Sequence, residues 1–142
     1  MTSYEIDFYT WAIEQAAAIR SGQYAQLDVD NIAEELESMG RSEKRALDSR
    51  LTVLLSHLLK WQYQPARRGK SWQLTIKGRR INVNDVLSDN PGLKAKLPEI
   101  LKHAYYRAII DASSETGIDE TSFPSECPWL FEQIIDSSFY PE

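Results

Sequence analysis

The chain has 142 residues, of which 42% are hydrophobic and 26% charged, and its formal net charge is −5. This balance is typical of one globular domain and excludes a disordered chain, while a single cysteine, Cys127, excludes an intramolecular disulfide. The N-terminus carries acid where a signal peptide carries base, and no apolar run reaches the ~20 residues that span a bilayer. We therefore predict a cytoplasmic protein without a membrane segment.

Capping residues and apolar spacing predict a first helix over residues 7–21. Asp7 is a suitable N-cap, and Gly22 can adopt the left-handed conformation that ends many helices. The apolar face of this helix is expected to consist of Phe8, Trp11, Ala12, Gln15, Ala16 and Ile19.

A second helix is predicted over residues 29–39, between the N-cap Asp28 and Gly40, which stands where a helix would stop. Its apolar side chains recur every three or four residues and are expected to face inward: Ile32, Leu36 and Met39. Its acidic side chains are expected to face mostly outward: Glu34, Glu35 and Glu37.

The strongest signal predicts a long central helix at about residues 43–63. Six leucines recur at the spacing of a wide apolar stripe: Leu47, Leu51, Leu54, Leu55, Leu58 and Leu59. No glycine or proline interrupts the sequence between Ser42 and Gln64, and Pro65 ends it. At 1.5 Å per residue, this helix would be about 30 Å long, enough to run the length of a domain.

A basic turn over residues 65–70 separates the central helix from a fourth helix that Ser71 can cap. Apolar residues at helical spacing continue beyond residue 80. Ile81 and Val83 also alternate, which leaves a short extended stretch as an alternative there.

The remaining signals complete an all-α chain. A long helix is predicted to end near Thr116, before Gly117, and a short last helix is predicted to start near Pro128. With no repeat or linker between these elements, we predict a single helical domain over residues 1–142. Its fold would be a bundle of about five main helices.

Several motifs resemble a known family. The most specific is His57-Leu-Leu-Lys-Trp-Gln-Tyr-Gln-Pro65, and others are Asp7-Phe-Tyr-Thr-Trp11 and Asn31-Ile-Ala-Glu-Glu35. The chain is similar over nearly its whole length to a largely cyanobacterial family of helical proteins, domain of unknown function family 29. The family's usual Gln-Arg pair is Arg79-Arg80 here. The resemblance implies an all-helical fold and supplies no catalytic residues.

Basic and aromatic residues alternate in one segment, which makes it the most specific candidate binding site. Its bases are Arg67, Arg68, Lys70, Arg79 and Arg80, and its aromatic residues include Trp61 and Trp72. Charges for phosphates and rings for base stacking suit single-stranded nucleic acid. The alternative is that the rings lie in the core and the arginines pair with acids of the second helix, which a sequence pI near 5.1 favours.

His57 is predicted to lie at the edge of the leucine stripe, next to Trp61. An imidazole there can act as an acid or base if a carboxylate orients it, but no acid lies three or four residues away. Such an enzyme would need Glu34 or Glu35 from the second helix. The simpler interpretation is a hydrogen-bonded histidine at the edge of the core.

No other residues form a strong chemical motif. Neither histidine has a glutamate three residues before it, as helical two-metal sites do, and Cys127 fits a turn before a helix. We therefore predict no metal, no cofactor and no catalytic residue.

Charge is distributed unevenly along the chain. Residues 1–40 contain eight acids and one base, residues 41–80 contain eleven bases and two acids, and residues 81–142 contain eleven acids and four bases.

Three functions remain open. The leading hypothesis is a non-enzymatic interaction module that binds a protein partner or a second copy of itself. The others are binding of nucleic acid or another polyanion through residues 67–80, and an enzyme built on His57.

Overall fold

The structure is a computed structural model that describes all 142 residues, of which 76% are helical and none is in a strand. The prediction of an all-α fold with five helices is thus confirmed. The helices are α1 (Phe8–Arg20), α2 (Val29–Tyr63), α3 (Lys70–Asp89), α4 (Leu97–Thr116) and α5 (Phe131–Ile135). No helix is both long and apolar enough to cross a membrane.

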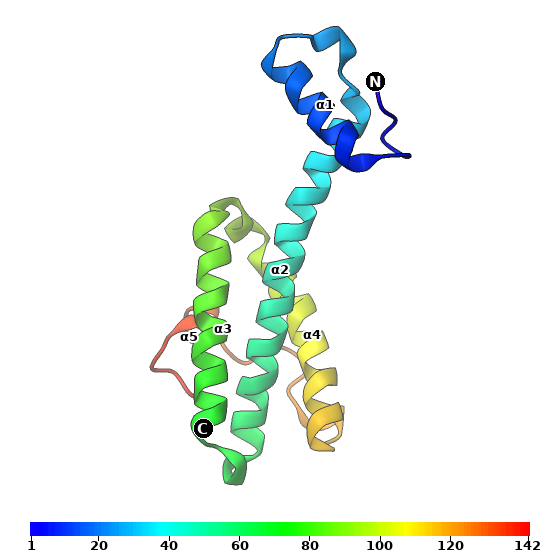
Figure 1. Cartoon of the computed structure of the whole chain (residues 1–142). Helices are drawn as coiled ribbons and strands as arrows, with labels where there is room; N and C mark the ends of the chain where they lie inside the picture. The colour runs from blue at the N-terminus through cyan, green and yellow to red at the C-terminus, as the bar shows by residue number, and fades with distance from the viewer. The chain divides into compact units, whose positions relative to one another are not determined.

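The chain packs into two compact units, Met1–Ser42 and Glu43–Glu142, and α2 contributes to both. In the second unit, α3 and α4 run alongside the C-terminal part of α2 (Figure 1). The six leucines of the predicted stripe are fully buried there: Leu47, Leu51, Leu54, Leu55, Leu58 and Leu59. They pack in one cluster with Ile76 and Val83 of α3, with Ile100 of α4 and with Ile134 of α5. The predicted central helix therefore forms the core.

The predicted break at Gly40 is wrong, because α2 continues through it as one helix. Glycine ends a helix when the chain needs a positive φ, and only Gly22 and Gly117 adopt one, with φ of +76° and +77°. Around Gly40 the neighbouring residues favour helix, and Arg41 forms ion pairs with Glu34 and Glu37 on the preceding turns. These interactions extend the helix across the glycine.

The other helix ends are close to their predicted positions. Asp7 caps α1 by accepting a hydrogen bond from the Thr10 backbone N–H at 3.0 Å, and Gly117 ends α4 in the left-handed conformation. Two predicted starts are wrong: α3 is capped by Gly69 rather than Ser71, and α5 begins at Phe131, not near Pro128.

The alternation of Ile81 and Val83 does not produce an extended stretch, because both residues lie within α3. Val83 is fully buried in the core cluster, while Ile81 is exposed. The helical period of the surrounding apolar residues therefore decides the local structure.

The first unit is a pair of helices, α1 and the first turns of α2. Its few buried side chains are those of Trp11, Gln15 and Ala18. The Trp11 Nε1–H donates to the Asp28 carboxylate at 3.0 Å, and the Asp28 backbone N–H donates to the Gln15 side chain at 2.8 Å. These bonds join the start of α2 to α1.

The prediction that Leu36 and Met39 face inward is wrong, since they are 64% and 65% exposed. Phe8 and Ile19, expected on the buried face of α1, are also exposed. A unit of only two helices has no third layer to cover this face. The first unit therefore has an apolar face but no third helix that buries this face.

Two glycine substitutions test whether α2 continues through Gly40 and whether α4 ends at Gly117. Gly40→Ala should stabilise the protein by about 0.5–1 kcal/mol, because alanine is the better helix former and its Cβ meets nothing within 4 Å. Gly117→Ala should destabilise it by about 1–2 kcal/mol, because Gly117 has a positive φ. Urea unfolding measures both, and destabilisation by Gly40→Ala would indicate a helix break there.

Candidate anion-binding site

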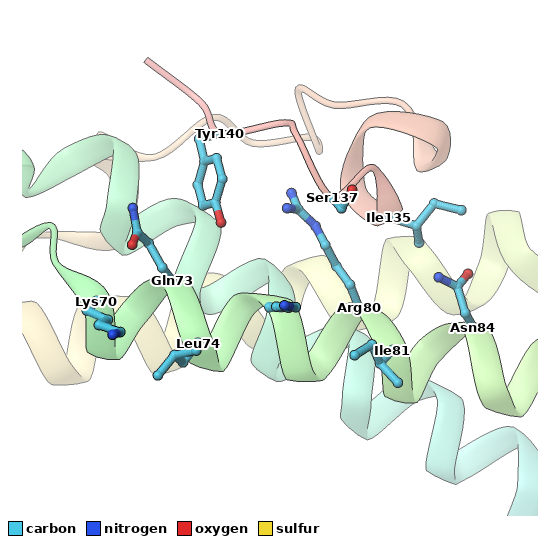
Figure 2. Close-up of a pocket in the computed structure, with 10 residues that line it drawn as sticks. Lys70, Gln73, Leu74, Arg80, Ile81, Asn84, Ile135, Ser137 and Tyr140 are labelled. Atoms are coloured by element: carbon cyan, nitrogen blue, oxygen red, sulfur yellow. The ribbon is translucent and has the colours of Figure 1, made fainter.

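A cavity of about 590 Å³ lies between α3 and the C-terminal segment (Figure 2). This volume is within the range of small-molecule sites. Its floor is one face of α3, where residues three or four positions apart share a surface. The α3 side chains include three bases, Lys70, Lys77 and Arg80, while Ser137 and Tyr140 contribute to the opposite wall.

Arg80 connects the two walls of the cavity. Its side chain extends from α3 toward the segment that carries Ser137 and Tyr140 (Figure 2). The Nε–H donates to the Ile134 carbonyl at 2.7 Å, and Nη2 donates to the Phe139 carbonyl at 2.6 Å. Its guanidinium carbon lies 5.3 Å from the centre of the Tyr140 ring. Arg80 therefore fixes the C-terminal segment against α3.

The Arg80 guanidinium is a buried cation without an acidic partner. The side chain is only 3% exposed, Nη1 has no hydrogen-bond partner, and no carboxylate lies within ion-pair distance. Burial lowers the pKa of Arg80, while Tyr140 and Asp136 act in the opposite direction. The residue stays protonated near neutral pH, since an arginine pKa lies far above it. An uncompensated buried charge is costly, and an anion nearby would offset that cost.

Lys70 and Lys77 add positive charge at the same cavity. Both are exposed, and neither forms an ion pair. Aliphatic side chains lie among the bases: Leu74 and Ile81 on α3 and Ile135 opposite. The lining contains no aspartate, glutamate, histidine or cysteine. This arrangement can bind an anion that has an apolar part.

The structure brings together only two of the five bases singled out in the sequence, Lys70 and Arg80. Arg67 is exposed at the end of the turn Pro65–Arg67, and Arg79 is half-buried; neither lines the cavity. Arg68 donates its Nε–H to the Trp61 carbonyl at 2.6 Å and lies over the Trp61 ring. None of these three arginines forms an ion pair with an acid.

Lys77 lies in the basic segment of the sequence but is not among the five bases predicted to bind a ligand. A helical period would have found it, since Lys77 is seven residues after Lys70 and three before Arg80. The C-terminal wall, with Ser137 and Tyr140, has no such signal. Only the fold brings it to α3.

The two tryptophans of the basic segment do not form an open stacking surface. Trp61 is buried, and its ring packs against Tyr140 with centroids 4.8 Å apart. Trp72 is half-buried, and the Lys60 ammonium lies 5.8 Å from its ring centre. Stacking of nucleic-acid bases needs exposed ring faces.

His57 is half-buried at the edge of the core, and its Nδ1 lies 3.0 Å from the Val53 carbonyl oxygen. Burial is the main cause that lowers the pKa of His57. The charged groups that affect it are Lys60 on its own helix, Arg79 on α3 and Glu115 on α4. No carboxylate forms a hydrogen bond with the ring. The His57 imidazole therefore lacks the acidic partner that would orient it for catalysis.

The remaining reactive groups do not form a second site. Burial raises the pKa of the Cys127 thiol, which donates to the Trp129 carbonyl, so the thiol is not activated as a nucleophile. No group of three or more histidine, cysteine, aspartate or glutamate side chains is placed to hold a metal ion.

A family model described as domain of unknown function DUF29 matches residues 3–140. The chain belongs to the DUF29 family. The match spans both units of this DUF29 chain and confirms the family resemblance of its sequence. A search of curated proteins and a search of solved structures each returned no match. The family description gives no activity, so only the geometry and charge of the site bear on function.

The buried position of His57 has a consequence for stability at acid pH. Its pKa is lower in the folded chain than the unfolded value of about 6.5, so the unfolded state binds the proton more strongly. Stability is therefore lost as the pH falls through about 6.5, and the loss is complete below the folded pKa. Between pH 7 and pH 5, the free energy of unfolding should fall more in the wild type than in His57→Gln.

Urea unfolding at the two pH values measures this difference. The control variant His103→Gln changes an exposed histidine that lies at ion-pair distance from Asp48, and its fall should be at least as large as that of the wild type. An equal fall in the wild type and His57→Gln would contradict the assignment.

Proposed function

We propose that this DUF29 protein is a non-enzymatic binding module whose second unit holds a small anionic ligand in the Arg80 cavity. The observation that carries the proposal is the Arg80 guanidinium, 3% exposed, with one nitrogen unpartnered and no carboxylate within ion-pair distance. A bound anion would supply the missing negative charge. The lining provides cations and no acid–base pair, which supports binding rather than proton-transfer chemistry.

The chemistry of the lining points to a phosphate monoester with an apolar body. Three cations favour a group with two negative charges over a single carboxylate. Lys70 and Lys77 act as mobile point charges that can follow the phosphate oxygens. The aliphatic side chains of Leu74, Ile81 and Ile135 offer surface for the rest of the molecule.

A small ligand is better supported than single-stranded nucleic acid. Arg67 and Arg79 lie outside the cavity, and the rings of Trp61 and Trp72 are already packed against other side chains. A nucleic-acid strand would need a longer row of exposed bases and rings. The concave cavity instead matches the size of a metabolite.

Calorimetric titration with phenyl phosphate at low salt tests the proposal. Phenyl phosphate should bind, and inorganic phosphate should bind more weakly because it lacks the apolar part. The double variant Lys70→Gln/Lys77→Gln should weaken binding by at least about tenfold, since both lysines are exposed and their loss leaves the fold intact. Higher salt should weaken binding in the wild type.

Lys102→Gln is the matched control, because Lys102 is an exposed lysine of α4 outside this cavity. It should bind phenyl phosphate as the wild type does. Neutral benzyl alcohol should not bind measurably. The proposal fails if phenyl phosphate does not bind at low salt, or if the double lysine variant binds it with unchanged affinity.

A further inference from the structure

A second concave surface lies wholly within the first unit, between α1 and the first turns of α2. It is a groove with a volume of about 350 Å³, and we call it the α1–α2 groove. Its apolar side chains come from both helices: Ala12, Ala16 and Ile19 from α1, and Ile32, Leu36 and Met39 from α2. The groove is separate from the Arg80 cavity and shares no residue with it.

The apolar groups of this groove are left open to solvent. Ile19 is 45% exposed, Leu36 64% and Met39 65%. Ala12 and Ala16 are small residues, so another backbone can come close to the floor of the groove. Contiguous exposed apolar surface is uncommon outside binding sites.

The spacing of the lining residues fits a helix as the occupant. On α1 they recur as 12, 16 and 19, and on α2 as 32, 36 and 39, which forms two parallel rows of apolar groups. A third helix laid between two such rows places side chains at i, i+3, i+4 and i+7 into the groove. The two-helix unit, which buries few side chains, would thereby gain a core of three helices.

The charge of this unit determines which helix fits. Residues 1–42 contain eight acids against two bases, Arg20 and Arg41. Only Glu34 and Glu37 form ion pairs, both with Arg41. Glu35 lines the groove itself, and its carboxylate accepts a hydrogen bond from the Tyr4 hydroxyl but has no cation. The groove therefore carries one acid without a cation, within a unit that has six more acids than bases.

This acidity argues against a second copy of the chain as the occupant. A symmetric pair would place the same groove on both sides of the interface, so Glu35 and its acidic neighbours would face their own copies. Like charges at an interface disfavour such pairing. A helix with lysines or arginines beside its apolar face would instead pair with these carboxylates.

We propose that the α1–α2 groove is the docking site for a basic amphipathic helix of a partner protein. The apolar side chains of that helix contact Ile19, Leu36 and Met39, and its basic residues lie opposite Glu35 and the neighbouring acids. This inference does not rest on the proposed anion site, because it concerns the other unit and a ligand of opposite charge.

The test uses the full chain and two synthetic peptides of 18 residues. Both peptides have leucines at i, i+3, i+4 and i+7 spacing, and the other positions are mainly lysine in one and glutamate in the other. Fluorescence anisotropy measures binding at moderate salt. The lysine peptide should bind, and the glutamate peptide should bind at least about tenfold more weakly.

The variant Leu36→Ser/Met39→Ser should weaken binding of the lysine peptide by at least about tenfold. Both side chains are exposed, so the fold should persist, and circular dichroism checks this. Val29→Ser is the matched control, because Val29 is an exposed apolar residue of α2 outside the groove. It should bind the lysine peptide as the wild type does, which separates groove binding from general attraction to an acidic surface.

Three results would overturn the assignment. The first is equal binding of the two peptides, and the second is unchanged binding of the lysine peptide by Leu36→Ser/Met39→Ser. The third is a stable dimer in sedimentation experiments that the same double variant dissociates, since a second copy would then occupy the groove.

Discussion

The Arg80 guanidinium binds the carbonyls of Ile134 and Phe139 and thereby fixes the C-terminal segment against α3. This segment has little regular structure beyond the five residues of α5, so its backbone needs partners outside itself. Tyr140 then packs against both Arg80 and Trp61, which joins the segment to α2 as well. Without Arg80 the segment would lose its main polar attachment, and the cavity would lose one wall.

No ion pair offsets the cost of burying the Arg80 charge. The ion pairs of the second unit lie elsewhere: Lys60 pairs with Glu115, Lys44 pairs with Glu99 at 2.6 Å, and Asp48 pairs with His103 and Arg107. The Lys60 and Lys44 pairs connect α2 to α4, and none of their four residues lines the cavity. Arg80, Lys70 and Lys77 form no ion pair with the protein's own acids, which is the basis of the proposed anion site. In the first unit the excess charge is negative, and the two proposed ligands are therefore opposite in charge.

The sequence predicted the features that depend on local pattern. The leucine spacing, the Asp7 cap and the Gly117 stop follow from helical periodicity and backbone preference, and the structure confirms them. The predicted helix end at Gly40 is wrong because a glycine permits a helix to end without requiring it, and Arg41 forms ion pairs across that turn. Leu36 and Met39 were misread because an apolar face shows that a residue can be buried, not that a covering element is present.

The site was predicted less well than the fold, because it depends on segments far apart in the chain. Five bases were grouped by their closeness in sequence, but a helix places consecutive residues on different faces. Arg79 and Arg80 therefore differ in burial, and Lys77 joins Lys70 on the cavity face. The wall around Tyr140 comes from a region some sixty residues later in the sequence. No local sequence pattern predicts that this C-terminal region packs against α3.

The central claim is that Arg80 is a buried cation whose counter-charge comes from a ligand. A crystal structure of the full chain grown with phenyl phosphate tests it most directly. We expect a phosphate group in the cavity, within hydrogen-bond distance of Lys70 or Lys77 and beside the Arg80 guanidinium. A cavity without phosphate at saturating concentration, or an Arg80 side chain that points into solvent, would contradict it.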